Sequence, residues 1–289
     1  MMRNTRRIFT LLLALAMLLC TVVSFASCKK KVDGAKDMEQ IKSAGKIVVG
    51  MECAYAPYNW AQAKSDAYAS VRLENGAYAD GYDVQVAKKI AESLGVSLEI
   101  KAVEWNGLAD ALESGQIDMI IAGMSPTAER KLTMDFTDTY YDSNLVMVVK
   151  KDSAYAAATS IADFSGARIT GQINTFHYKV IDQISGVNKQ PELEDFAALI
   201  QSLRSGSIDG YVCEKPGAES AVASNPEFTY VEFAEGKGFT CDPAESSIAI
   251  GVRKNSDMTA EINKILSTLS KADRDRMMSE AISRQPAEN

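Results

Sequence analysis

Short apolar runs alternate with amphipathic segments along the first half of the chain, and this order constrains the fold most. Residues 46–50 form a β-branched run that ends in glycine, as buried strands do. Residues 83–94 carry apolar side chains on one helical face, and Gly95 ends that pattern. A strand at 96–103, a short helix at 104–115 and an apolar strand at 119–122 follow. The order predicts an α/β fold with a parallel sheet covered by helices.

A second block of the same kind follows residue 144. The run 144–150 predicts a strand that no helix precedes. Further strands are expected at 168–171, 208–212, 228–233 and 247–252, with helices from Thr175, from Leu193 to Leu203 and from Pro216. Two closing helices complete the pattern, the first capped by Ser256 and the second over 272–282.

The loop after the strand at 119–122 combines residues suited to a small anion. Gly123 lets a ligand approach the backbone, Ser125 offers a hydroxyl donor, and Arg130 offers a planar fork that matches a carboxylate. Thr127 is expected to cap a helical turn here. The alternative is an ordinary strand-to-helix turn with a surface arginine.

The segment that leaves the first strand is rich in aromatic and polar side chains. Within residues 51–60 it holds Glu52, Tyr55, Asn59 and Trp60 around a proline. Aromatic residues on a loop at the end of a strand are typical of ligand walls. A surface turn with incidental aromatic residues is the alternative.

The N-terminus predicts export. Residues 1–27 begin with three arginines, continue through an apolar run and end in small residues, as a cleaved leader does. Phe25-Ala-Ser-Cys28 resembles the bacterial lipobox, which implies lipidation of Cys28 and a membrane anchor; a secreted protein with a free Cys28 is the alternative. Residues 28–45 are expected to form a tether to the first strand.

Charge and cysteine content exclude several classes of function. The formal charge of −7 becomes −10 once the three leader arginines are removed, which argues against nucleic acid as a partner. With one histidine and no CxxC pair, no metal site is expected. Cys53, Cys213 and Cys241 permit at most one disulfide, and their spacing does not decide which pair forms it.

In its motifs the chain resembles the extracellular solute-binding proteins of polar amino-acid ABC transporters (solute-binding protein family 3). The motifs cover nearly the whole mature chain: Gly-x-Glu-x-x-Tyr-x-Pro-Tyr at 50–58, Gly81-Tyr-Asp-Val, Trp105-Asn-Gly-Leu, Ile117-Asp-Met-Ile-Ile-Ala-Gly-Met-Ser-x-Thr-x-Glu-Arg130, Phe136-Thr-Asp-x-Tyr-Tyr, Gln172-Ile-Asn-Thr-Phe-His177 and Ile208-Asp-Gly-Tyr-Val-x-Glu214. Their order and spacing are more specific than any one of them.

The resemblance implies a periplasmic-binding-protein-like fold of type II, with two lobes, a two-strand hinge and a ligand cleft between the lobes. Lobe 1 would comprise residues 46–142 and 247–289, and lobe 2 residues 143–246. It also implies a monomer without cofactor, lipid-anchored outside the cell membrane, that captures a free L-amino acid and delivers it to a transporter permease. A sensory partner of a receptor and a dehydratase-like enzyme on the same scaffold are the alternatives.

Site residues follow from the same motifs by position. Arg130 would hold the ligand carboxylate with Ser125, and Gly123 would place its carbonyl on the ammonium. From lobe 2, Thr175 and the N–H of Phe176 would add to the carboxylate site, and Glu214 would pair with the ammonium. The side-chain pocket is implied to consist of Tyr55 and Trp105, tuned by Glu52, Asn59, Trp60, Met124, Gln172 and His177.

Two departures from the family pattern concern the loop and the specificity. Asn174 stands where relatives have glycine, so the backbone of this loop is expected to change. Glu52 stands where aspartate is common, and a second acid among aromatic residues favours a polar or cationic ligand. Asn59 and Gln172 could equally serve glutamine, and an apolar wall with Met124 could accept cystine or a branched residue.

Overall fold

The computed structural model describes residues 34–286, so the expected leader and Cys28 lie outside the described residues. A first five-stranded sheet has the order β6-β1-β7-β14-β8. Its strands are β1 (Lys46–Met51), β6 (Ser97–Ala102), β7 (Met119–Ile120), β8 (Met134–Asp142) and β14 (Ser247–Arg253). β1 runs parallel to β6 and β7, whereas β14 runs antiparallel to β7 and β8. The predicted parallel arrangement of the three strands up to residue 122 is therefore confirmed, and β8 runs in the same direction, so that β14 is the reversed strand of this sheet.

Helices predicted on this sheet are present. They are α3 (Tyr82–Leu94), α4 (Leu108–Glu113) after the 3-10 turn η2 (Trp105–Gly107), α9 (Thr259–Ser267) and α10 (Lys271–Arg284). Gly95 ends α3 in a left-handed conformation with φ 69°, which is the cap its glycine predicts. A small sheet of order β2-β3-β5-β4 adjoins them, with β2 (Ala54–Tyr55), β3 (Asn59–Gln62), β4 (Val71–Arg72) and β5 (Tyr78–Asp80).

A second five-stranded sheet has the order β11-β10-β12-β9-β13. Its strands are β9 (Leu145–Lys150), β10 (Arg168–Thr170), β11 (Asn188–Lys189), β12 (Gly210–Glu214) and β13 (Phe228–Val231). The helical segments beside it are η4 (Ile161–Phe164), α5 (Phe176–Val180), η5 (Ile181–Gln183), α6 (Phe196–Ser205) and α7 (Lys215–Ser224). Strand β12 is buried along its whole length, as the apolar run predicts.

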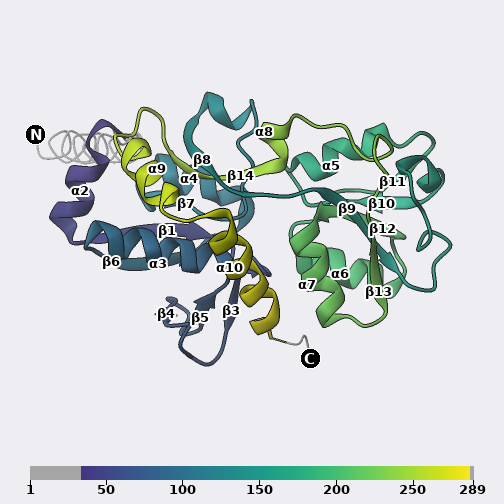
Figure 1. Cartoon of the computed structure of the whole chain (residues 1–289), viewed down its shortest axis with the longest axis horizontal. Helices are drawn as coiled ribbons and strands as arrows, with labels where there is room; N and C mark the ends of the chain where they lie inside the picture. Colours follow the sequence, from purple (N-terminus) through teal and green to yellow (C-terminus); the bar gives the residue numbers. More distant parts are fainter. Residues whose placement is uncertain (1–33, 287–289) are drawn as a thin grey trace, which may run out of the picture. The chain divides into compact units, whose positions relative to one another are not determined.

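The two large sheets are joined by two crossing segments (Figure 1). The chain leaves the first sheet at Asp142 and enters the second at Leu145; it returns through α8 (Pro243–Ser246) into β14. Ser247 at the start of β14 is paired with Asp142 at the end of β8, so the two crossings lie next to each other. We refer to the residues of the first and small sheets with their helices as lobe 1, and to those of the second sheet as lobe 2.

The predicted tether is wrong for its described part, because residues 34–44 are helical. The 3-10 turn η1 (Gly34–Lys36) leads into α2 (Asp37–Ala44). Asp37 is fully buried, and its carboxylate lies 2.6 Å from Arg253 on β14 and accepts a hydrogen bond from Ser256 at 2.7 Å. Ile41 packs in the core of lobe 1. The composition of this stretch is that of a linker, and the distant partner of Asp37 could not be read from it.

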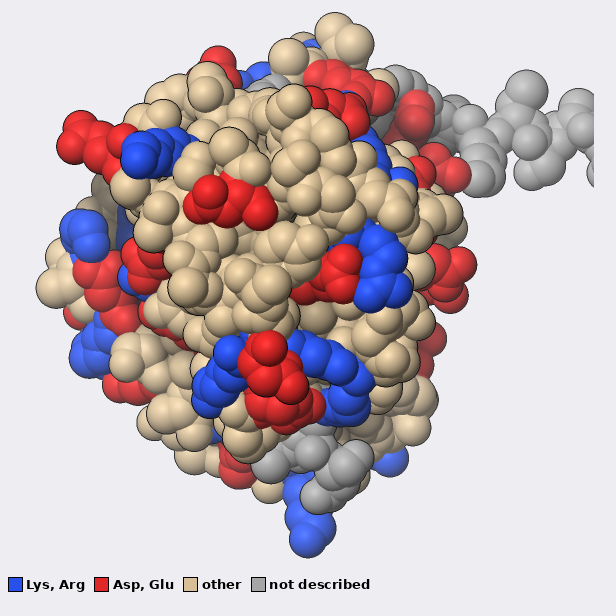
Figure 2. All heavy atoms as spheres, turned by 90° about the vertical axis from the view of Figure 1, so that its right-hand side faces the viewer, with Lys and Arg blue, Asp and Glu red and all other residues tan. Residues whose placement is uncertain are grey.

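Lobe 2 carries charges of both signs on its outer face. In Figure 2 its Lys and Arg side chains lie in small groups beside Asp and Glu. Ion pairs of this lobe include Arg168–Asp209 at 2.6 Å and Lys215–Glu232 at 2.7 Å. Within residues 34–286, no helix is both long and apolar enough to cross a membrane.

Candidate functional site

The loop between β7 and β8 is held in place by buried polar contacts. Gly123 has φ 59°, and a Cβ there would lie 3.1 Å from the Tyr55 ring, so only glycine fits. Its N–H donates to the Tyr140 hydroxyl at 3.2 Å. Thr127 Oγ1 accepts from the N–H of Arg130 at 3.3 Å, the bond expected of a cap, although the helical turn is only η3 (Arg130–Leu132).

Arg130 is a partly buried residue whose guanidinium is held by backbone carbonyls of both lobes. It donates to the carbonyl of Ser125 at 2.8 Å and to that of Asn174, in lobe 2, at 3.0 Å. Its Cζ lies 5.0 Å from the centre of the Trp105 ring. Among the described residues no carboxylate forms an ion pair with it, and burial lowers its pKa to about 10. A cation in this position favours an anion as its further partner.

Glu214 is a buried carboxylate at the end of β12, in lobe 2. Its side chain is 1% exposed, and His177 Nε2 lies 2.9 Å from its Oε1. From lobe 1, the hydroxyl of Tyr55 donates a hydrogen bond to Oε2. Burial by itself raises the pKa of Glu214, but His177 and Tyr55 together hold it below its usual value. Glu214 is therefore an anion with one partner in each lobe.

Tyr55 reaches across from β2 into lobe 2. Its ring stacks on Phe196 of α6 with centroids 4.0 Å apart and 13° between the planes. A Cβ at Gly217 of α7 would lie 3.2 Å from this ring, so the glycine leaves room for it. Burial raises the pKa of the Tyr55 hydroxyl well above its usual value, so this group stays a neutral donor to Glu214.

A second contact between the lobes joins Glu52, which follows β1, to Gln172, which follows β10. Gln172 Nε2 lies 3.1 Å and 3.3 Å from the two carboxylate oxygens of Glu52. Burial raises the pKa of Glu52 to about 7, against the lowering effect of the Gln172 hydrogen bond. A neutral amide does not compensate this carboxylate, so a cation near Glu52 would be stabilised there.

The remaining predicted residues of the carboxylate side are buried beside Arg130 and His177. Ser125 contributes the carbonyl that Arg130 contacts, and Met124 accepts a backbone hydrogen bond from Ala249 of β14 at 3.0 Å. Thr175 precedes α5 and donates its hydroxyl to the carbonyl of Gln172 at 2.7 Å. Phe176 lies against the His177 ring with centroids 4.4 Å apart.

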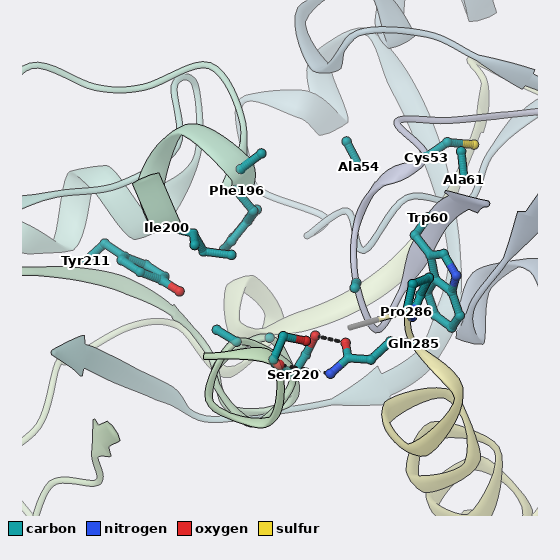
Figure 3. A pocket seen from close by; sticks show the side chains of 15 residues that line it. Cys53, Ala54, Trp60, Ala61, Phe196, Ile200, Tyr211, Ser220, Gln285 and Pro286 are labelled. Atoms are coloured by element: carbon teal, nitrogen blue, oxygen red, sulfur yellow. Dashed lines mark hydrogen bonds between the residues drawn. The ribbon is translucent and has the colours of Figure 1, made fainter. Parts of the chain in front are cut away.

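The polar atoms of Asn59 and Trp60 are bonded to other residues of lobe 1. The amide of Asn59 donates to Asp83 at 2.8 Å and accepts from the N–H of Cys53 at 2.7 Å, so its polar atoms are used within lobe 1. Trp60 donates to Gln62 and lines a separate cavity of about 280 Å³ between the lobes. Figure 3 shows that Phe196, Ile200 and Tyr211 line this cavity from lobe 2. Gln285, which also lines it, is hydrogen-bonded to Ser220.

Two residues that the sequence did not single out as ligand contacts support the site. Asn174 has φ 56°, a left-handed conformation that glycine adopts readily and asparagine tolerates. Its side chain donates to Asn106 of lobe 1 at 2.7 Å. Asp83 is fully buried and accepts from Tyr140 at 2.7 Å; burial raises its pKa to about 6. Its signals in the sequence were its place at the start of an amphipathic helix and in the Gly81-Tyr-Asp-Val motif, and neither indicated this buried role.

The cysteines and acids outside these contacts do not add a second chemistry. Cys53 and Cys213 are buried free thiols, and burial raises the pKa of Cys53 to about 12. Among residues 34–286, no group of three or more His, Cys, Asp or Glu side chains is arranged to hold a metal ion.

Comparison with known proteins identifies the family. The model of the bacterial extracellular solute-binding proteins, family 3, matches residues 47–280. The chain belongs to this family. The arginine-binding extracellular protein ArtP of Bacillus subtilis (strain 168) is 28% identical over 257 residues, covering 86% of this chain and 88% of ArtP. The L-cystine-binding protein TcyJ of Escherichia coli (strain K12) is 26% identical over 235 residues, covering 81% of each chain.

Solved structures of this solute-binding family match the fold. The protein AbpA of Streptococcus pneumoniae, an amino acid ABC transporter substrate-binding protein bound to L-arginine, aligns with a TM-score of 0.71 at 25% identity, over 85% of this chain and 98% of AbpA. A mutant of ArgBP from T. maritima aligns with a TM-score of 0.69 at 30% identity, over 86% of this chain and 100% of ArgBP. The predicted two-lobe α/β fold is confirmed.

Proposed function

We propose that this chain captures a free L-amino acid between its lobes and delivers it to an ABC transporter permease without converting it. The observation that carries the proposal is the guanidinium of Arg130, which has no carboxylate partner among the described residues, together with the buried Glu214 from the other lobe. An amino acid is a zwitterion, and it brings the two opposite charges that such a pair of groups would bind.

The role of each residue follows from its charge and its place. Arg130 would bind the carboxylate with both arms of its fork, and Glu214 would face the ammonium. Trp105 and Tyr55 would flank the side chain, since one ring covers Arg130 and the other contacts Glu214. Because Arg130 and Glu214 belong to different lobes, the ligand would bridge the lobes, and periplasmic binding proteins close around their ligands by such a hinge motion.

A cationic side chain is the ligand class that we favour. Glu52 is a buried acid with a neutral amide partner, and its carboxylate would gain most from a cation. The relatives include arginine-binding, histidine-binding and cystine-binding proteins, of which the first two take ligands of this class. Cystine, which carries two zwitterionic ends, remains the competing ligand from the same comparison.

A screen of the twenty amino acids by thermal shift tests the proposal. A ligand at 100 times its Kd stabilises the folded chain by ~2.7 kcal/mol, which a melting curve resolves. We expect the largest shift with a cationic amino acid and no chemical change of that ligand by mass spectrometry. No shift with any amino acid, or turnover of the bound one, would contradict the proposal.

The anchoring and assembly of the protein extend the same proposal. We propose a monomer with lobe limits at residues 142/143 and 246/247, lipidated at Cys28 and held on the outer face of the cell membrane. The lipobox and the extracellular description of the family support this location. Expression with a Cys28→Ser change should move the protein from the membrane fraction to the medium or periplasm, whereas an unchanged distribution would argue against the lipid anchor.

A further inference from the structure

We infer that His177 and the ammonium group of the ligand compete for Glu214, so that amino-acid binding releases a proton from His177. The inference rests on the proposed function, because it concerns the same carboxylate. It means that binding releases a proton to the solvent, so that the affinity depends on pH through His177, on the Glu214 side of the site.

The geometry places both groups in one buried spot. His177 Nε2 lies 2.9 Å from Glu214 Oε1, and the two side chains are 5% and 1% exposed. Neither ring nitrogen of His177 has a hydrogen-bond partner among the described residues, and the same is true of Glu214 Oε1. The imidazole therefore lies directly against the carboxylate, in the place where a positive charge would be compensated by Glu214.

The other charged and titratable groups around this pair do not replace His177. Tyr55 from β2 donates a neutral hydroxyl to Glu214, while Tyr58 lies near it from the adjoining loop. Arg130 attracts the Glu214 charge from a distance and Asp83 repels it. On the α5 side, the neighbour of His177 is the apolar ring of Phe176. His177 is thus the one cation-forming group in ion-pair contact with Glu214 among the described residues.

Charge balance decides how a ligand can enter. An ammonium placed against Glu214 while His177 stays protonated would leave two cations beside one carboxylate in a desolvated site. Loss of one proton from His177 to the solvent restores a single ion pair, with the ammonium as its cation. The charge around Glu214 is the same before and after this exchange, because an ammonium replaces an imidazolium; the broken bond is the imidazolium N–H, and its proton goes to the solvent.

Proton linkage gives the size and direction of the effect. Where His177 is protonated in the free protein, binding releases up to one proton, and the affinity falls by up to tenfold for each unit that the pH decreases. Once the pH is high enough for a neutral His177, the affinity becomes independent of this group. A ligand that carries no ammonium next to Glu214 would show no such dependence.

Calorimetry measures the released proton directly. L-arginine is a suitable probe because its guanidinium does not titrate in this range. Titration at pH 6 in two buffers of different ionisation enthalpy should show a buffer-dependent heat for the wild type, and a smaller one for His177→Gln. Glu52 also titrates near neutrality, so the same comparison in a Glu52→Gln background isolates the share of His177. Equal proton release with and without His177 would overturn the inference.

The single histidine of the sequence permits a second test that needs no His177 variant. Its imidazole gives one set of ring resonances in NMR of the wild-type protein. We expect the midpoint of their titration to move to lower pH when L-arginine, or the amino acid selected by thermal shift if that is not histidine, is bound. An unchanged midpoint with bound ligand would overturn this inference alone. A protein that binds none of the twenty amino acids would overturn the proposed function as well.

Discussion

The Arg130 side and the Glu214 side of the site differ in what already occupies them. Arg130 is held by neutral carbonyls of both lobes and has no ion pair among the described residues, whereas Glu214 has an ion pair with His177 and a hydrogen bond from Tyr55. A carboxylate that joins Arg130 adds a charge partner. An ammonium that joins Glu214 replaces one. Under the proposed function, the two halves of one amino acid would therefore bind by different routes, the carboxylate by addition and the ammonium by exchange.

This difference predicts which half carries the affinity. An added ion pair contributes its attraction less the cost of desolvating the ligand carboxylate, and it relieves an uncompensated cation, whereas an exchanged pair contributes only the difference between two cations. We therefore expect substitutions on the Arg130 side to reduce ligand affinity more than substitutions that act on lobe closure or on the surrounding acids.

Replacement of Arg130 by lysine is expected to have the largest effect. Arg130→Lys keeps the charge but loses the two parallel bonds to a carboxylate, and affinity should fall by about 2–5 kcal/mol. Titration calorimetry with L-arginine measures the loss. Lys131→Gln, a change of the exposed neighbouring cation, is the matched control and should leave affinity within error. Equal affinity of Arg130→Lys and wild type would place the ligand carboxylate elsewhere.

Replacement of Glu52 by glutamine tests the acid that takes no part in the inferred exchange at Glu214. Because burial raises the pKa of Glu52 from 4.5 to about 7, the folded state binds a proton that the unfolded state has lost. Wild type should lose stability as pH rises from about 4.5 to about 7, and Glu52→Gln should be the more stable protein by about 1–3 kcal/mol at pH 8 without ligand.

Urea unfolding at pH 5 and pH 8 checks this expectation. The difference between the two proteins should shrink at pH 5, where Glu52 is protonated when folded. Glu104→Gln changes an exposed acid and is the control. Ligand affinity should show the opposite preference, with wild type binding a cationic amino acid more tightly than Glu52→Gln does. The same change should weaken binding of a neutral amino acid of similar size less. Equal weakening of both would remove the cationic assignment.

A pair of substitutions at Asn174 sharpens the role of the loop that reaches Arg130. Asn174 has φ 56°, and its carbonyl accepts from Arg130. Asn174→Ala should cost about 1–2 kcal/mol of stability, since a side chain without a local hydrogen bond is strained there. Asn174→Gly accepts the conformation and should cost less in the same thermal unfolding experiment. Both changes remove the bond to Asn106 equally, so the reverse order would show that the left-handed backbone at residue 174 does not limit stability.

The smallest effect on ligand affinity is expected at the end of α10. A change there should weaken binding of the carboxylate and of the ammonium alike. Gln285 donates to the carbonyl of Ser220 on α7 at 2.9 Å, which links α10 of lobe 1 to lobe 2. Gln285→Ala should weaken binding by about 0.5–1.5 kcal/mol through closure alone. Ser283→Ala, an exposed change on the same helix, is the control. A changed pH dependence of binding in Gln285→Ala would show that it acts on Glu214 instead.

The sequence predicts local order well and distant partners poorly. The periodicity of residues 46–122 is sufficient for the strand and helix order, because apolar spacing reports burial on one face. It could not predict that β14 returns antiparallel to β7, since that pairing joins residues more than 120 positions apart. The helix at Asp37–Ala44 was missed for the same reason, because its buried acid depends on Arg253.

The candidate site shows the same limit within single motifs. The resemblance to the family's motifs brought Arg130, Glu214 and His177 together as site residues, and the structure places His177 against Glu214. It could not show that the polar atoms of Asn59 are used by Cys53 and Asp83. A polar residue on a loop carries the same letter whether it faces a ligand or supports the loop, and only packing separates the two cases.

The stacking of Arg130 on Trp105 gives the protein an optical signal of its own. The chain has two tryptophans, and Trp105 lies 5.0 Å from the guanidinium while Trp60 lines the cavity near Gln285. An indole excited beside a bare cation emits in a different electric field from one beside a compensated ion pair. Arrival of a carboxylate at Arg130 should therefore shift the emission of Trp105, so that binding can be followed in real time without a dye.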